Sequence, residues 1–144
     1  MAFHSLKFRT FSQATEDEEK VSRALKFASG TDSVTRSVAE GYHGNKIIIL
    51  TATVRSQKEI SRFFERLTNN DLLALSDTID DRVDDQGDLH LRLDKQKAFL
   101  GELTISDGED VISVEGTVKA YPKRREIALM TVNRYLDELF HSKE

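Results

Sequence analysis

Hydrophobic and polar residues alternate along several segments of the chain, as they do in strands that bury one face of a sheet. The clearest segment is 89–94, where three leucines alternate with His90, Arg92 and Asp94. This spacing places the leucines in the core and the polar side chains on the opposite face. The other segments that predict strands are 3–11, 33–41, 45–54, 102–106 and 111–121.

Four of these segments form two predicted hairpins. The first hairpin turns at residues 41–45, and the last one turns at Asp107 and Gly108. In the final strand the residues that share one face are Ile112, Val114, Gly116, Val118 and Ala120. The hairpins favour a mostly antiparallel sheet.

Two capping boxes predict the starts of helices. In each box a hydroxyl residue is followed three positions later by a glutamate, Thr15 with Glu18 and Ser56 with Glu59. Apolar residues follow at helical spacing, namely Val21, Ala24, Leu25 and Ala28 in the first helix and Ile60, Phe63, Phe64 and Leu67 in the second. The predicted helix ends are Gly30 for the first helix and Asn69 with Asn70 for the second.

Two further helices are predicted from the same spacing. A third helix carries Leu72, Leu75, Ile79 and Val83, and Gly87 ends it. A terminal helix begins at Pro122, which suits a first helical position, and turns Leu129, Val132, Leu136 and Leu139 inward. Its first turn holds Lys123, Arg124 and Arg125, where the helix dipole disfavours cations. An anionic ligand at this turn would offset that cost.

The predicted order of elements is β-α-β-β-α-α-β-β-β-α. A chain of 144 residues fits one domain with its own core. Strands that return antiparallel, with helices gathered together, indicate an α+β sandwich. We therefore expect one domain over residues 1–144, with a mostly antiparallel sheet, helices packed on one face and the opposite face open.

The composition narrows the possible chemistry. The chain has no cysteine, which excludes disulfides, cysteine-based zinc sites and thiol catalysis. It has neither a signal-peptide core nor an apolar run long enough to cross a bilayer. We expect a soluble, cytoplasmic protein with no membrane partner.

The net charge of −4 conceals an uneven distribution of acids. Residues 71–88 hold seven aspartates and one arginine, a net charge of −6, and the four acids of residues 16–19 add −4. Since the whole chain carries −4, the remainder carries +6. The helix dipole accounts for acids at 16–19, and the acids of 71–88 fit a solvated helix face. Whether the excess of cations elsewhere forms one surface depends on the fold.

Three groups of residues are candidates for contact with a nucleic acid. Cations and an amide at Arg92, Lys95, Gln96 and Lys97 suit phosphate and sugar better than acid-base catalysis. A second basic cluster comprises Lys119, Lys123, Arg124 and Arg125, and Lys7 and Arg9 share a strand face that could extend it. At the first hairpin, Tyr42 and His43 could stack on an unpaired base. The alternatives are solvated strand ends for the cations and a core-capping role for the tyrosine.

The sequence lacks several motifs that are typical of catalytic or nucleotide-binding sites. The four histidines are far apart in sequence, with no His-Glu-x-x-His motif and no serine elbow. Residues 84–88 resemble a calcium loop only superficially, because aligning Gly87 with the loop glycine puts Arg82 at the first ligand position. Neither a phosphate-binding GxxxxGK[ST] loop nor a dinucleotide GxGxxG motif occurs. We predict no catalytic residues, no metal site and no cofactor.

Five short motifs follow one another over nearly the whole chain. They are TFSQATEDEEK at 10–20, EGYHGN at 40–45, LRLDKQ at 91–96, LGE at 100–102 and AYP at 120–122. In these motifs the chain resembles a family of small archaeal RNA-binding proteins, often described as predicted exosome-associated subunits. The resemblance implies a fold like the ribosomal L-five protein or the double-stranded-RNA-binding domains, and RNA binding without catalysis.

These observations converge on a non-catalytic RNA-binding protein that acts in RNA processing. We expect it to recognise structured or double-stranded RNA through phosphate and shape contacts. The alternative is a protein-interaction adaptor within an RNA-processing or exosome-like assembly, with residues 71–88 docking a basic partner. An enzyme that uses a metal or a small molecule is a third hypothesis, and homo-oligomerisation is left open.

Overall fold

A computed structural model describes residues 2–41 and 44–142. One antiparallel sheet runs through the molecule in the strand order β2-β3-β1-β5-β4. Its strands are β1 (Phe3–Ser12), β2 (Thr35–Glu40), β3 (Lys46–Val54), β4 (Leu89–Asp94) and β5 (Val111–Val118). The prediction of an antiparallel sheet is confirmed.

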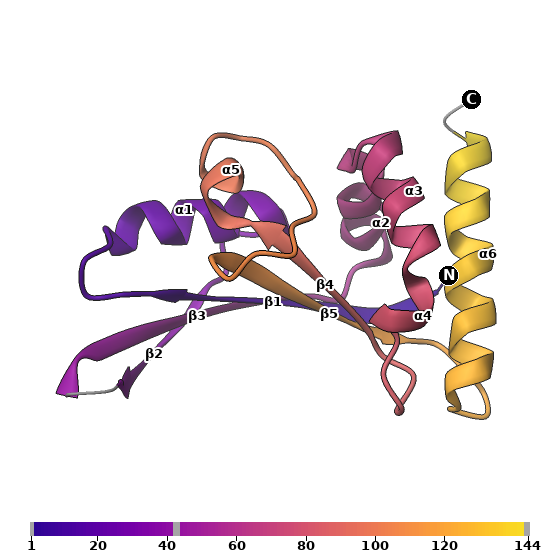
Figure 1. The fold of residues 1–144 in the computed structure, drawn as a ribbon, viewed down its shortest axis with the longest axis horizontal. Helices are drawn as coiled ribbons and strands as arrows, with labels where there is room; N and C mark the ends of the chain where they lie inside the picture. The colour runs from indigo at the N-terminus through magenta and orange to yellow at the C-terminus, as the bar shows by residue number, and fades with distance from the viewer. Residues whose placement is uncertain (1, 42–43, 143–144) are drawn as a thin grey trace.

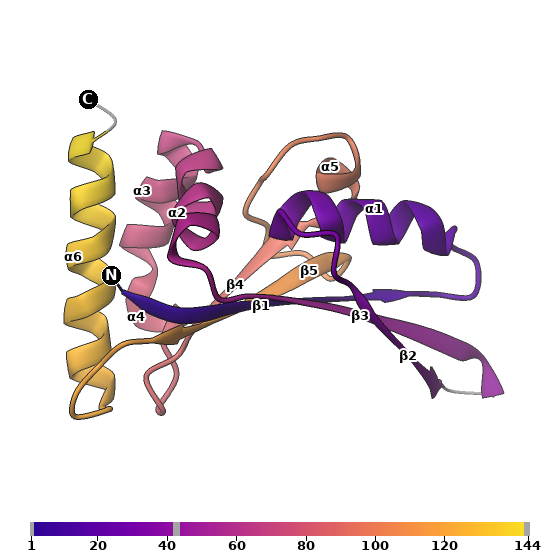
Figure 2. The same cartoon turned by 180° about the vertical axis from the view of Figure 1, so that it is seen from behind.

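Helices cover one face of this sheet and leave the other face open (Figures 1 and 2). They are α1 (Glu18–Ser29), α2 (Gln57–Arg66), α3 (Asn69–Asp77), α4 (Ile79–Arg82), α5 (Lys95–Phe99) and α6 (Arg125–Ser142). Helices α1 and α5 lie side by side above the sheet, and α6 stands at the end where β1 begins. The α+β architecture is therefore confirmed. No helix of the described part of the chain has the length and apolarity that crossing a bilayer requires.

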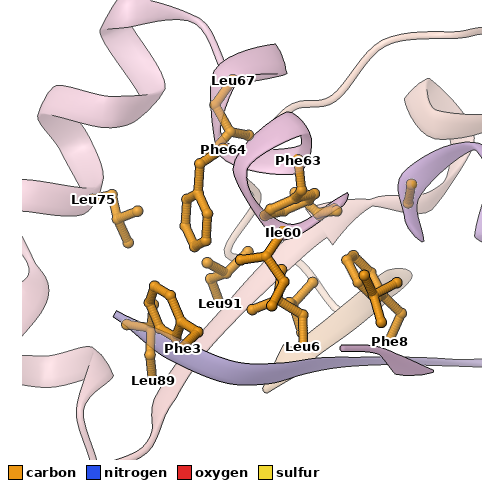
Figure 3. Close-up of a cluster of buried hydrophobic side chains, with 14 of the residues drawn as sticks. Phe3, Leu6, Phe8, Ile60, Phe63, Phe64, Leu67, Leu75, Leu89 and Leu91 are labelled. Carbon is orange, nitrogen blue, oxygen red and sulfur yellow. The ribbon is translucent and has the colours of Figure 1, made fainter. Parts of the chain in front are cut away.

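The core lies between the sheet and the helices. Along β1, Leu6 and Phe8 point into the core and are buried, while their neighbours Lys7 and Arg9 are exposed. The ring of Phe63 from α2 meets Phe8 edge-on at 5.2 Å between centroids (Figure 3). Full burial of one such side chain contributes about 1.5–3 kcal/mol to stability. The alternation predicted for this strand decides which residues remain on the open face.

Of the two predicted hydroxyl caps, the one at Ser56 forms. The Ser56 hydroxyl accepts a hydrogen bond from the backbone N–H of Glu59, as predicted. The box at Thr15 was wrong, because Asp17 caps α1 by accepting from the N–H of Glu19. An aspartate at this position satisfies the first turn, and the helix begins at Glu18.

The boundary between the second and third helices also differs from the prediction. Asn69 and Asn70 do not end α2; Leu67 ends it, and Thr68 caps α3 by accepting from the N–H of Asp71. The predicted third helix is divided at Thr78, whose hydroxyl donates to the carbonyl of Ala74. Hydroxyl side chains that bond locally to the backbone thus set both boundaries.

The predicted strand at 102–106 was wrong. Within the described residues this segment forms only an isolated bridge between Leu93 and Ile105, and β5 pairs directly with β4. The intervening chain forms the short helix α5, which Asp94 caps by accepting from the N–H of Lys97. The predicted alternation of β5 is confirmed, since Ile112 and Val114 are buried.

The terminal helix begins at Arg125 and not at Pro122. The N–H of Arg124 bonds to the carbonyl of Pro122, and this turn precedes the helix. Ala128 occupies a fully buried position of α6, and Leu129 is only partly buried. Two of the three cations predicted in the first turn therefore precede the helix.

Candidate nucleic-acid interface

The open face of the sheet carries two rows of polar side chains across β1, β5 and β4. Residues paired in an antiparallel register point to the same face. Arg9 pairs with Ser113, which pairs with Arg92, and this gives the first row. Lys7 pairs with Glu115, which pairs with His90, and this gives the second row. The polar side chains predicted to be exposed on β1 and on β4 therefore lie on the same face of the sheet.

These rows border a shallow hollow of about 460 Å³. Its basic side chains are Lys7, Arg9, Arg82 and Arg92, and its other polar side chains are His90, Ser113 and Glu115. We call this set of seven residues the open-face hollow. Four basic groups facing one carboxylate give it a positive character at neutral pH.

The cations of the open-face hollow have few strong partners. Lys7 makes no ion pair or side-chain hydrogen bond within residues 2–41 and 44–142. Arg82 and Arg92 share the carboxylate of Asp107, at long nitrogen–oxygen distances of 3.7 and 3.9 Å. The Asp107 and Arg92 side chains are 82% and 47% exposed, so water screens that pair, whereas Arg82 is only 13% exposed and its Nε donates to the Thr78 hydroxyl at 2.7 Å. An incoming phosphate would meet positive groups that are only loosely neutralised.

Asp84 holds His90 at the rim of the hollow. The His90 ring nitrogen lies 2.7 Å from the Asp84 carboxylate, which also accepts from the N–H groups of Gln86 and Asp88. Partial burial by itself would raise the pKa of Asp84, but the Asp88 N–H and the His90 ring together lower it below its ordinary value. The carboxylate therefore stays charged and fixes the ring beside the hollow.

Phe11 extends the open face beyond Arg9. Its side chain is 40% exposed, it pairs in register with Ile49 of β3, and the Arg9 guanidinium lies 5.4 Å from its ring centroid. The sequence analysis missed this residue, although the alternation through Lys7 and Arg9 continues to it. It also missed four residues that the tertiary fold brings to the hollow, namely Arg82, His90, Ser113 and Glu115.

Lys95 occupies a different environment from the one predicted. Its side chain is 5% exposed, and its ammonium lies 2.8 Å from Glu16 and 2.7 Å from Asp110. The same ammonium donates to the carbonyl oxygen of Phe11 at 3.0 Å. Burial would lower the pKa of Lys95, but the two carboxylates more than offset this and raise it. Lys95 is thus a buried cross-link, and a ligand cannot reach its ammonium without displacing these partners.

The neighbours of Lys95 lie away from the open face. Gln96 and Lys97 belong to α5, on the side of the sheet that the helices cover (Figure 1). The Gln96 amide donates to Asp110 at 3.0 Å, and Lys97 is exposed. The fold therefore separates Arg92 from the three polar residues that follow it in the predicted cluster.

The second predicted cluster is largely engaged within the fold. Lys123 forms an ion pair of 2.8 Å with Asp88 and donates to the carbonyl of Val118. Arg125 donates to the carbonyls of Val83 and Asp80. The remaining members are Lys119, which is partly buried, and Arg124, which is exposed. The predicted stacking pair, Tyr42 and His43, lies outside the described residues.

The described residues offer no grouping of three His, Asp or Glu side chains that could hold a metal ion. The open-face hollow instead offers guanidinium, ammonium, imidazole and hydroxyl groups together with the one carboxylate of Glu115. The guanidinium, ammonium and hydroxyl groups can donate hydrogen bonds to phosphate oxygens.

Comparison with known sequences adds a separate line of evidence. A family model described as RNA binding matches residues 5–118. The RNA-binding protein PAB1135 of Pyrococcus abyssi is 37% identical over an alignment that covers 93% of this chain and 94% of that protein. The matched range contains all the residues of the open-face hollow.

Solved structures of similar proteins share the fold. Mth689, a DUF54 protein from Methanothermobacter thermautotrophicus, is 34% identical, with a TM-score of 0.79 over 94% of this chain and 99% of that chain. Protein AF2318 from Archaeglobus fulgidus is 32% identical, with a TM-score of 0.81 over 93% of this chain and 99% of that chain. The architecture described above is therefore that of several archaeal relatives.

Proposed function

The chain belongs to the RNA-binding family whose model matches residues 5–118, and on this premise we propose that the open-face hollow is the RNA-binding surface. One observation carries this proposal. Lys7 and Arg9 on β1 and Arg92 on β4 point to the same face of the sheet, and none of the described residues forms a strong ion pair with them. Cations are the usual protein partners of phosphate, so this surface suits an RNA backbone.

We propose that the ligand is structured or double-stranded RNA. Neighbouring strands lie about 4.8 Å apart, so cations on β1 and on β4 are separated by roughly 10 Å on a rigid support. Fixed cations of this kind read the position of phosphates and not the base edges. Double-stranded RNA is recognised in this way, through its shape, its phosphates and its 2′-hydroxyls.

A triple substitution tests the proposed surface. Lys7→Ala, Arg9→Ala and Arg92→Ala together should weaken binding to a structured RNA by about tenfold or more, because each removes charged hydrogen bonds. The control is Lys58→Ala with Arg62→Ala, which removes exposed cations from α2 on the covered side of the sheet. Fluorescence anisotropy measures the affinity, and circular dichroism checks the fold. Equal affinities of the triple variant and the wild type would refute the proposed surface.

The proposed role is non-catalytic and belongs to RNA processing in the cytoplasm. The resemblance in sequence implies RNA binding without catalysis, and the cations of the hollow suit contact with phosphate. The resemblance in sequence suggests that the protein acts within an exosome-like assembly. Incubation of labelled RNA with the protein, followed by denaturing electrophoresis, tests whether the role is non-catalytic. Shortened RNA would contradict a non-catalytic role.

A second candidate function is that of an adaptor that binds a basic protein partner. The observation that favours it is the exposure of Asp77, Asp80, Asp81 and Asp85, whose carboxylates form no ion pair with the described residues. Pull-down of one defined partner that survives nuclease treatment would support the adaptor. Asn substitutions at these four positions should abolish that capture, whereas Gln at the exposed Glu102 and Glu109 should not. Capture that persists in the fourfold variant would exclude this surface.

A further inference from the structure

Phe11 is an exposed aromatic side chain that the phosphate contacts above leave unexplained. It lies on the open face in the same strand as Lys7 and Arg9, and 40% of its side chain is exposed. A large apolar ring on a polar sheet face loses the stabilisation that burial would provide. The other phenylalanines of β1, Phe3 and Phe8, are buried. Part of the Phe11 side chain is therefore accessible to a ligand on the open face.

The neighbours of Phe11 define which ligand fits. The Arg9 guanidinium lies over the Phe11 ring, 5.4 Å from its centroid, so a cation already packs against the ring. On β3, Ile49 pairs with Phe11 and continues the apolar surface. An apolar ring next to an arginine, at the edge of a basic hollow, matches a nucleotide, because a base can stack on the ring while its phosphate meets the cation.

Two hydrogen bonds from buried side chains tie the chain around Phe11 to neighbouring segments. The buried ammonium of Lys95 donates to the carbonyl oxygen of Phe11 at 3.0 Å, and the Thr10 hydroxyl donates to the carbonyl of Val111 at 3.0 Å. Both contacts tie the end of β1 to the adjacent chain. A stacking platform needs this rigidity, since a base gains little from a ring whose position is not fixed.

We propose that Phe11, with Arg9 beside it, stacks on one unpaired base of the bound RNA. The inference rests on the proposed function and makes its ligand more specific. The RNA is structured, its backbone lies across the open-face hollow, and one nucleotide next to that backbone is unpaired and turned onto the Phe11 ring. A base within an intact duplex cannot reach the ring in this way, because its faces are already stacked on neighbouring bases.

Two RNAs and three variants test this proposal by fluorescence anisotropy. The RNAs are a duplex and the same duplex with one additional unpaired adenosine. Wild-type protein should prefer the second RNA by about five- to 150-fold, the range for one base stacked on an aromatic ring. Phe11→Ala and Phe11→Leu should abolish this preference while retaining the affinity for the plain duplex. Phe11→Tyr, which preserves the ring, should keep it.

The outcomes separate this inference from the proposed function. A preference that persists in Phe11→Ala, or that is absent in the wild type, would overturn the stacking site while RNA binding itself stands. A wild-type protein that binds neither RNA would overturn the proposed function. Retention of the preference by Phe11→Leu would show that apolar area and not ring stacking is responsible, which also contradicts the proposal. Circular dichroism confirms that each variant is folded.

Discussion

Lys95 contributes to the fold in a way that its place in the sequence does not reveal. Its ammonium joins three segments, since it binds Glu16, Asp110 and the carbonyl of Phe11. Alternation predicted the face for Lys7, Arg9 and Arg92, because strand geometry depends on local sequence alone. The burial of Lys95 depends on two distant carboxylates that only the tertiary structure brings together. Local pattern could not predict it.

The cross-link predicts a stability effect. Lys95→Met should lower the free energy of unfolding by about 1.5–3 kcal/mol, the range for hydrogen bonds to charged groups, because two carboxylates lose their partner. Denaturant unfolding followed by circular dichroism measures the change. Lys97→Met is the matched control, since Lys97 is exposed two residues away and should change stability by less than about 0.5 kcal/mol. Equal effects of the two substitutions would show that the buried ion pairs contribute nothing.

Removing the charge of Asp107 should strengthen RNA binding, whereas removing the cations of the hollow should weaken it. Asp107 pairs at long distance with Arg82 and Arg92, where an RNA phosphate would compete with it. Asp107→Asn should therefore strengthen RNA binding by about two- to fivefold, in line with the free energy of exposed ion pairs. Glu109→Gln removes an exposed charge from the same loop and should have a smaller effect. Anisotropy titration compares the two variants, and weaker binding by Asp107→Asn would count against this site.

At the scale of elements, periodic segments were predictable and their boundaries were not. The apolar stripes of α1 and α2 and the alternation of β1, β4 and β5 all correspond to buried residues. The boundaries depend on which of several possible side chains caps the helix. In α1 the cap is Asp17 and not the predicted Thr15. The segment 102–106 has a strand-like composition, but β4 occupies the place beside β5 that a hairpin would need.

Alanine substitution should cost more stability at Gly87, in the turn before β4, than at Gly101. Gly87 has φ +82°, and an added Cβ would lie 3.1 Å from the Cβ of Ala128 in α6. Gly101 has a similar φ of +89°, but an added Cβ would meet nothing within 4 Å. Alanine at either position strains the backbone by about 1–2 kcal/mol. Gly87→Ala should lose a further 1 kcal/mol or so, because α6 is close-packed against the turn.

Thermal unfolding of both glycine variants tests this contact. The melting temperature of Gly87→Ala should fall below that of Gly101→Ala, which carries the backbone strain alone. Equal melting temperatures would mean that α6 can move away from the turn at Gly87 without a loss of folding free energy. The packing of α6 against this turn would then not contribute to the position of β4.

At the scale of the whole molecule, the distribution of charge matters more than its sum. The chain carries −4, yet the open-face hollow carries four basic groups and one carboxylate. Exposed aspartates lie instead on the segment that contains α3 and α4. The sequence predicted that acids and bases are segregated. It could not predict that Arg82, within the acidic segment, turns toward the hollow, because that depends on how α4 packs beside β4.

The salt dependence of RNA binding tests the central claim most directly. Binding driven by phosphate contacts weakens as salt rises, with a slope of log K against log salt of about −0.9 per phosphate neutralised on a duplex. Between about 50 and 200 mM salt, wild-type protein should lose affinity for a structured RNA steeply. The Lys7, Arg9 and Arg92 triple alanine variant should show a slope that is shallower by about two to three units, since three phosphate contacts are gone. A wild-type slope near zero, or an identical slope in the variant, would contradict RNA binding at the open-face hollow.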